Sequence, residues 1–225
     1  MQLTPLSRLF TSLCLALFLP LVAVTALKAQ DSQSYGALTL HGSIPSSEPY
    51  SNVAKFGGGL GFDGANFIHP LFGIAYHVGV NINPYNRSNT NFGLNVGAND
   101  DTQPWVNANL MLGGELSYPI TPAIAPEFRA LAGLMVARAP QVKYGTLGEI
   151  EADIAPAFGY SIGGGLKFIN NEGASAIRIG IQYQAANPKF SRNTSIVGIG
   201  TGAVEGKQKI DMLSIYVSFA FLSRK

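Results

Sequence analysis

Five charged residues follow a spacing that puts them on one side of the chain's extended segments. Each lies in a stretch where large apolar residues alternate with small or polar ones, and each falls on the small and polar side: Glu115, Glu127, Arg129, Lys167 and Arg178. Carboxylates and cations that leave water must be paired or hydrated. We expect these two acids and three bases to form an ionic network that plugs the inside of the fold. Independently hydrated charges at a wet opening are the alternative.

Acid–base catalysis has few candidates in this sequence. The histidines are His41, His69 and His77, and none follows position 77. A Ser–His–acid site needs its members close together in space, and the sequence indicates no such arrangement. We therefore expect His77 to be a hydrogen-bonded filler of the interior. The chain is predicted not to be an enzyme and to use no cofactor.

Metal and phosphate binding are equally poorly indicated. The carboxylates of Glu149, Glu151 and Asp153 lie in one connection, where they could hold calcium weakly, but we expect them to be solvated. The runs Gly57–Gly59 and Gly163–Gly165 lie in predicted strands with no helix N-terminus after them, so they are not phosphate-binding loops. We expect these glycines to ease tight curvature, and we predict no metal site.

The element that must position the interior side chains is clearest at residues 72–83. Every even-numbered residue from Phe72 to Ile82 is large and apolar, and every odd-numbered one is small or polar. A period of two predicts a β-strand with one apolar and one polar face. The strand exceeds the usual ~5–6 residues and fits the ~9–11 residues that a tilted strand needs to cross a bilayer. Because its polar face carries no Lys, Glu or Asp, we expect that face to line a narrow barrel.

The same alternation recurs along the chain and predicts eight strands in total. The other seven are expected at residues 35–43, 56–62, 105–118, 127–136, 158–168, 177–183 and 210–221. Pro126 lacks the backbone donor that a sheet uses, so we expect the fifth strand to begin at Glu127 or to contain a local bulge. The last strand is expected to end at Phe221, with a short tail beyond it.

The composition fits a protein whose outer surface faces lipid. Charged residues make up 12% of the chain, about half of the ~25% typical of soluble domains, and the mean hydropathy is +0.19. After residue 29, no apolar run approaches the ~20 residues of a membrane helix. Backbone groups in lipid must be paired within the protein, which leaves a closed barrel. The predicted fold is all-β, an eight-stranded antiparallel up-and-down transmembrane β-barrel.

The beginning of the chain has the features of an export signal, predicted at residues 1–29, and residues 30–225 are predicted to form one barrel domain. Arg8 precedes an apolar stretch from Leu9 to Val24, and Ala29 supplies a small residue for cleavage. A retained membrane helix is the alternative interpretation. Cleavage is favoured because polar residues interrupt the apolar stretch and small residues follow it.

Removal of this segment would change both cysteine content and charge. Cys14 is the only cysteine of the chain, so its loss excludes disulfides and cysteine-ligated metals. Loss of Arg8 and Lys28 reduces the 15 basic residues to 13, which equals the 13 acidic residues. This balance does not indicate binding to nucleic acid.

The connections between the predicted strands differ in length in a regular way. Loops are expected at residues 44–52, 84–104, 138–155 and 185–209, of which the last three are long, and turns at 63–71, 119–122 and 170–173. Long extracellular loops and short periplasmic turns are typical of outer-membrane barrels. Both ends of the barrel domain are therefore expected in the periplasm. Five aromatic residues fall at the level of the short turns, as an interfacial girdle would: Phe72, Tyr118, Phe168, Phe219 and Phe221.

With these features the chain resembles the small eight-stranded outer-membrane β-barrels of the OmpA and OmpX type, which are grouped as outer-membrane β-barrel domain or porin-family proteins. The resemblance covers nearly all of residues 30–225 and rests on the signal, the strand phase, the alternating connections and a last strand that ends in Phe. It implies an integral protein of a Gram-negative outer membrane, in contact with outer-membrane lipid. It does not imply one function, because this architecture hosts adhesins, resistance proteins, small channels and lipid-modifying enzymes.

The expected function is envelope structure together with surface interaction through the long loops, performed by a monomer that binds an extracellular ligand. A narrow passive channel or transporter for small solutes is the alternative. Eight strands leave too little lumen for an aqueous pore, yet many inward residues are Gly, Ala or Ser. A lipid-modifying enzyme is the least supported of the three classes.

Overall fold

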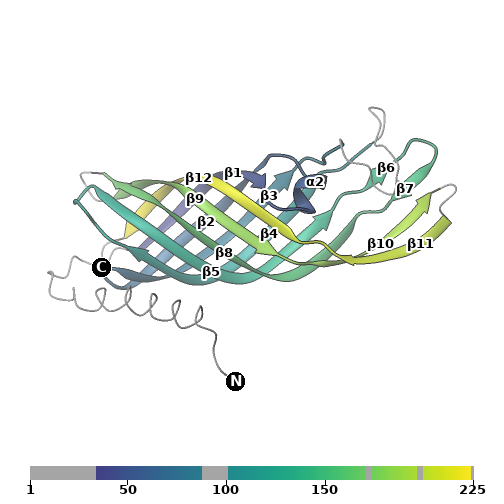
Figure 1. Cartoon of the computed structure of the whole chain (residues 1–225). Helices are drawn as coiled ribbons and strands as arrows, with labels where there is room; N and C mark the ends of the chain where they lie inside the picture. Colours follow the sequence, from purple (N-terminus) through teal and green to yellow (C-terminus); the bar gives the residue numbers. More distant parts are fainter. Residues whose placement is uncertain (1–33, 88–100, 171–173, 197–199, 224–225) are drawn as a thin grey trace, which may run out of the picture. The chain divides into compact units, whose positions relative to one another are not determined.

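The computed structural model describes residues 34–87, 101–170, 174–196 and 200–223 (Figure 1). The export signal predicted at residues 1–29 lies outside these ranges. So do the last two residues of the predicted C-terminal tail and much of the connection at residues 84–104.

Eight long antiparallel strands form a closed barrel (Figure 1). They are β1 (Ser34–Pro45), β2 (Gly57–His69), β3 (Phe72–Asn83), β4 (Trp105–Ser117), β5 (Ile124–Ala139), β8 (Asp153–Ile169), β9 (Ser175–Ala186) and β12 (Ile210–Ser223). Each pairs with the next barrel strand along the chain, and β1 pairs with β12 to close the barrel. The predicted eight-stranded up-and-down barrel is confirmed.

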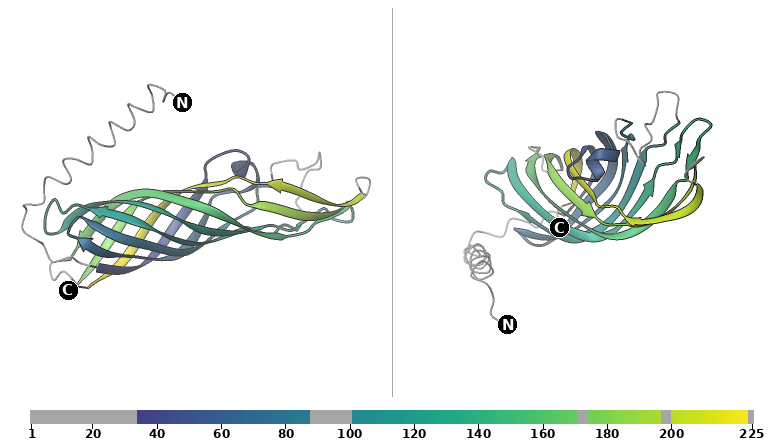
Figure 2. Two further views of the ribbon diagram at one scale, coloured as in Figure 1. Left: turned by 90° about the horizontal axis from the view of Figure 1, so that it is seen from below. Right: turned by 45° about the vertical axis from the view of Figure 1, so that its right-hand side comes forward.

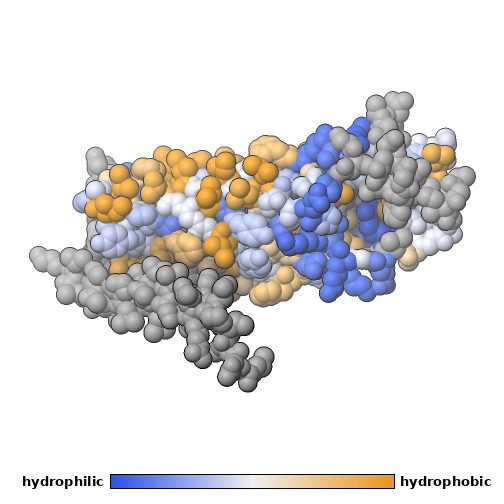
Figure 3. Space-filling view, in the orientation of Figure 1, coloured by the Kyte–Doolittle hydropathy of each residue, from blue (hydrophilic) through white to orange (hydrophobic). Residues whose placement is uncertain are grey.

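The predicted alternation of the barrel wall is also confirmed. In β3, the outward side chains of Ile74, Val78 and Val80 are 50%, 49% and 41% exposed, whereas the inward Ala75 and Asn81 are fully buried. Figure 3 shows apolar side chains gathered over the barrel strands. Because a strand turns successive side chains to opposite faces, one sequence pattern produces both an apolar outer wall and a polar interior.

Several strands extend beyond their predicted ends; β8, for example, begins at Asp153 and not at residue 158. β2 continues to His69, so residues 63–69 belong to a strand and not to a turn. β5 begins at Ile124, before Pro126, which accepts a hydrogen bond from the Tyr118 backbone N–H. In an antiparallel ladder a residue's N–H and C=O point to the same neighbour. The missing donor of Pro126 therefore faces Tyr118, the first residue beyond β4, so the loss falls at the end of the ladder.

The end of the last strand was also predicted too short. β12 runs to Ser223, which pairs with Ser34, and the Leu222 backbone N–H donates to Ala174 O at 2.9 Å. Pairing with β1 keeps these residues in the barrel wall although their side chains no longer show strong alternation.

The long connections contain regular structure that was predicted as loop. β6 (Val142–Lys143), β7 (Gly148–Ile150), β10 (Lys189–Ile196) and β11 (Gly200–Lys207) form a second sheet in the order β11-β10-β7-β6. Figure 2 shows β10 and β11 continuing past the barrel, at the end away from the short turns. The first connection contains the short helix α2 (Tyr50–Val53). Within the described ranges, no helix is long and apolar enough to cross a membrane.

Candidate functional site

All five charged residues singled out in the sequence point into the barrel, and the structure brings them together. Their side chains come from four neighbouring strands, and none of the five residues is more than 5% exposed. Glu115 on β4 stands directly opposite Arg129 on β5, and Lys167 on β8 stands opposite Arg178 on β9. The pairing of strands therefore fixes the depth at which these charges meet.

Ion pairs join the five side chains into one network. Arg178 Nη2 lies 2.7 Å from Glu127 Oε1, and Arg129 Nε lies 3.2 Å from Glu115 Oε2. Lys167 Nζ bridges the two acids, at 3.3 Å from Glu115 Oε1 and 3.8 Å from Glu127 Oε2. A buried charge that loses its partner is strongly destabilising, so these contacts make the members depend on one another.

Asp63 is a sixth member of this ionic network that the sequence reasoning missed. Its carboxylate lies 2.8 Å from Arg129 Nη1 and 3.7 Å from Arg178 Nη1, and it contacts His77 Nδ1 at 2.8 Å. With Asp63 included, three carboxylates face three permanent cations. The sequence did contain a signal for it. If the alternation of residues 55–61 is continued by one further step, Asp63 falls on the inward side of the strand.

Each carboxylate of the ionic network also accepts a hydrogen bond from a hydroxyl on the strand pair that closes the barrel. Tyr35 on β1 donates to Glu115, Thr39 on β1 donates to Asp63 at 2.5 Å, and Tyr216 on β12 donates to Glu127 at 2.9 Å. Thr39 and Ser218 are further joined at 2.8 Å between their hydroxyl oxygens. The ionic network is thereby tied to both the first and the last strand.

Glycines make room for Tyr216 in the interior. A Cβ atom built on Gly165 or Gly180 would come within 2.7 Å and 2.5 Å of the Tyr216 hydroxyl. Glycine in the run at residues 163–165 thus has a packing role beside the expected easing of curvature. Any side chain at these two positions would displace the phenol from Glu127.

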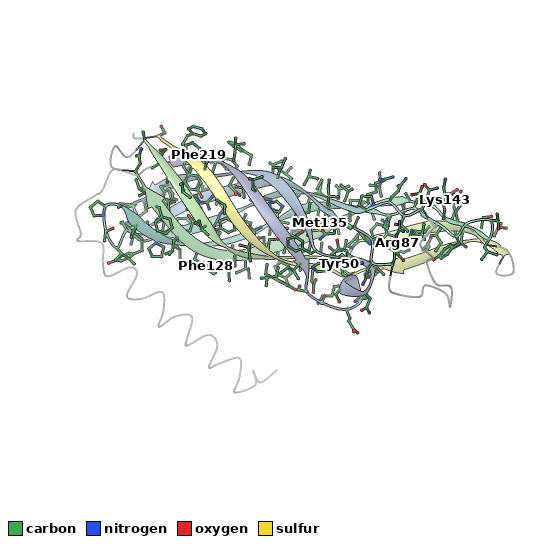
Figure 4. The ribbon with its side chains drawn as sticks, turned by 90° about the horizontal axis from the view of Figure 1, so that it is seen from above. Tyr50, Arg87, Phe128, Met135, Lys143 and Phe219 are labelled. Atoms are coloured by element: carbon green, nitrogen blue, oxygen red, sulfur yellow. The ribbon has the colours of Figure 1, made fainter. Side chains whose placement is uncertain are left out.

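The ionic network lies at the end of the barrel that carries the short turns. Glu115 and Lys167 are two residues from the ends of β4 and β8, while Glu127 and Arg178 are three residues from the starts of β5 and β9. The aromatic residues predicted for this level are all exposed on the outer wall, by 39–59%: Phe72, Tyr118, Phe168, Phe219 and Phe221. Figure 4 shows Phe128 and Phe219 on this part of the barrel.

The middle of the interior is neutral and packed. Asn81, Asn109 and Gln184 are no more than 4% exposed, and Met111 and Met135 are fully buried. The space left beside His41 and His77 is a cavity of about 10 Å³, which is room for about one water molecule. This cavity by itself is therefore too small to form a continuous aqueous path.

The opposite end of the barrel is covered by α2. Tyr50, which is labelled in Figure 4, is fully buried. Its hydroxyl accepts a hydrogen bond from Asn107 Nδ2 at 3.0 Å. The Trp105 ring meets Tyr50 edge-on with 5.5 Å between centroids, and Trp105 Nε1 donates to Val53 O at 3.1 Å. This aromatic cap lies in a connection that was predicted to be a plain loop.

Comparison with known proteins gives the fold but no closer relative. No family model and no curated protein matches the chain. Among solved structures, OprG, an outer membrane protein from Pseudomonas aeruginosa, is 10% identical with a TM-score of 0.55, covering 87% of this chain and 98% of that chain. A major outer membrane protein from Thermus thermophilus is 11% identical with a TM-score of 0.52, covering 84% of this chain and 99% of that chain. This chain has the fold of the small outer-membrane β-barrels.

The barrel places its histidines in structural surroundings. His77 contacts Asp63 through Nδ1, and His69 Nδ1 accepts from the Leu71 backbone N–H at 3.3 Å. The centroids of the His41 and His77 rings lie 6.5 Å apart. These contacts position the rings within the wall and the interior.

The acidic residues of the connection between β5 and β8 are engaged separately. Glu149 accepts from Gln141 at 2.9 Å, and Glu151 accepts from Asn193 at 2.9 Å. Asp153 accepts from a backbone N–H of β10 at 2.6 Å. Within the part of the chain that the structure describes, no group of three or more His, Cys, Asp or Glu side chains is arranged to hold a metal ion.

Proposed function

We propose that this protein is an integral barrel of the bacterial outer membrane, without enzymatic activity, that supports envelope structure and presents its second sheet for interactions at the cell surface. The observation that carries the proposal is the distribution of side chains, which is the reverse of that in a water-soluble protein. Large apolar residues such as Leu40, Leu112 and Phe158 are 62–76% exposed on the outer wall, while three carboxylates and three cations are buried inside. Water would penalise such an outer wall, whereas the hydrocarbon of a bilayer would not.

The orientation that we propose puts the second sheet outside the cell and the short turns in the periplasm. β11 exposes Thr201, Glu205 and Lys207, which are suited to polar contacts with an extracellular partner. The ionic network would then lie at the periplasmic end, and the barrel would act as a monomer because each of its strands already has two neighbours.

A narrow channel for small solutes is the second candidate, and the packed interior argues against it. The ionic network occupies one end of the barrel, and the aromatic cap around Tyr50 covers the other. The cavity between them, near His77, has room for about one water molecule. A closed barrel that acts through its wall and its second sheet fits these contacts better than a pore does.

Cysteine labelling on intact cells tests the proposed location and orientation. On a Cys14→Ser background no other cysteine is present, so single substitutions report single positions. We expect a membrane-impermeant maleimide to label Thr201→Cys on intact cells. Ala123→Cys, in the turn between β4 and β5, should be labelled only after the outer membrane is permeabilised.

The lipid-facing position Val78→Cys serves as the matched control and should resist the reagent in both states. Labelling of Ala123→Cys but not of Thr201→Cys on intact cells would reverse the orientation. Recovery of the protein in a soluble periplasmic fraction would contradict the proposal as a whole.

A further inference from the structure

A second, larger cavity lies where the aromatic cap meets the second sheet. Its volume is about 210 Å³, close to the share of about seven water molecules in the liquid. Its apolar lining includes Val53, Trp105, Ile150 and Phe190. The Trp105 and Phe190 rings meet edge-on with centroids 5.9 Å apart, and both residues are no more than 4% exposed. The cavity can therefore receive one aromatic ring or a short aliphatic body.

This cavity, called the mouth cavity below, is positively charged on its polar side. Arg192 and Lys207 line it, and no Asp or Glu side chain does so among the described residues. Arg192 donates through Nε to Glu151 O at 3.1 Å and through Nη2 to Pro140 O, and both acceptors are backbone carbonyls. Asp153 acts on Arg192 electrostatically without forming an ion pair in the described part of the chain. Burial lowers the pKa of the Arg192 guanidinium from its ordinary value.

A neighbouring lysine, unlike the cations of the cavity, is paired with a carboxylate. Lys189, which pairs with Lys207 in the ladder of β10 and β11, lies 2.5 Å from Glu205 Oε2. Arg192 and Lys207 have no such carboxylate against them within the described ranges. A half-buried guanidinium with only neutral hydrogen-bond acceptors favours an anion beside it.

We propose that the mouth cavity binds a small organic anion, whose ring or short aliphatic body packs on Trp105 and Phe190 and whose carboxylate faces Arg192 and Lys207. Apolar walls with a few placed polar groups are the usual composition of small-molecule sites. The volume limits the ligand to one ring or a chain of similar size. This site adds a ligand class to the proposed surface role, and its test uses purified protein in detergent, independently of cellular location.

The intrinsic fluorescence of the protein gives a direct test. Trp105 is the only tryptophan of the chain and lines the cavity, so a bound heavy atom should quench the whole tryptophan signal. We expect saturable quenching by 4-bromobenzoate. The neutral 4-bromobenzamide should bind about tenfold more weakly, because it loses the charge-assisted hydrogen bonds. The cationic 4-bromobenzylamine should show no saturable quenching.

Three variants separate the cation effect from partition of the probes into micelles. Arg192→Gln and Lys207→Gln should each weaken 4-bromobenzoate binding by about tenfold while leaving 4-bromobenzamide binding unchanged. Lys189→Gln, which does not line the cavity, should behave as the parent protein. Arg192→Gln loses its contacts to two backbone carbonyls. If it does not fold for that reason, the fast-migrating band of the folded barrel in unboiled gel samples will be absent. In that case binding of 4-bromobenzoate to Lys207→Gln tests the role of the cations. Equal quenching by the three probes, or unchanged 4-bromobenzoate binding in Lys207→Gln, would overturn the assignment.

Discussion

Replacing Arg178 by methionine is expected to lower the free energy of unfolding of the barrel by about 3–5 kcal/mol, the usual cost of removing one partner of a buried ion pair. Arg178 is fully buried and donates through Nε and Nη2 to Glu127 at 2.7–3.0 Å. Without it, the partners that the Glu127 carboxylate keeps among the described residues are Lys167 and the Tyr216 hydroxyl. Urea titration, followed by the heat-modifiable gel migration of the folded barrel, measures the effect.

Two controls distinguish this cost from a general effect of the substitution. The double variant Arg178→Met with Glu127→Leu should regain much of the loss, since a buried ion pair can often be replaced by apolar residues without destabilisation. Lys189→Met removes the cation of an exposed pair and should change stability little. A single Arg178→Met variant as stable as Lys189→Met would mean that the interior charges are hydrated and independent.

Val78→Arg is expected to destabilise the barrel in a bilayer by about 2–4 kcal/mol, the cost of a lipid-facing arginine near the midplane. Val78 lies in the middle of β3 and is 49% exposed on the outer wall. The same charge added on the second sheet, as Thr201→Arg, should have almost no effect because the proposed orientation places that position outside the lipid. Urea titrations in lipid vesicles compare the two variants.

Equal stability of Val78→Arg and Thr201→Arg would show that the outer wall is not in contact with hydrocarbon. The same pair in detergent micelles should differ less, since a micelle deforms around a charge more easily than a bilayer does. This contrast links the penalty to lipid and not to a loss of strand pairing.

The barrel strands could be predicted from the sequence because one physical requirement is repeated in each of them. The lipid side needs apolar residues and the interior needs small or polar ones. The sequence of a strand such as β3 therefore indicates both that it is a strand and which of its faces points inward. The ends of strands are less constrained. β2 and β12 continue past the predicted ends because backbone pairing with neighbours extends further than side-chain alternation does.

The candidate site was only partly predictable for a related reason. Glu115 and Arg178 fall in phase with clear strands, whereas Asp63 lies where the alternation was taken to end. The contact between Tyr35 and Glu115 joins residues 80 positions apart in the sequence. Such a contact depends on the closure of the barrel, which no local pattern encodes.

The outer parts of the protein gave the weakest sequence signal. β10 and β11 are rich in Gly, Ser and Thr and contain few large apolar residues, so their sequences resemble those of polar loops. The position of Tyr50 depends on packing against Trp105 and Asn107, which come from a distant strand.

A sealed interior would make the protein work through its wall and its outer surface and not as a pore. Conductance of the purified barrel in planar bilayers tests this most directly. We expect no discrete conductance steps from the parent protein, and none from Arg129→Ala, because the packed middle of the barrel and the cap over Tyr50 stay in place when the contacts to Asp63 and Glu115 are lost. Regular steps from the parent protein, unchanged in Arg129→Ala, would contradict the account and make the narrow channel the better function.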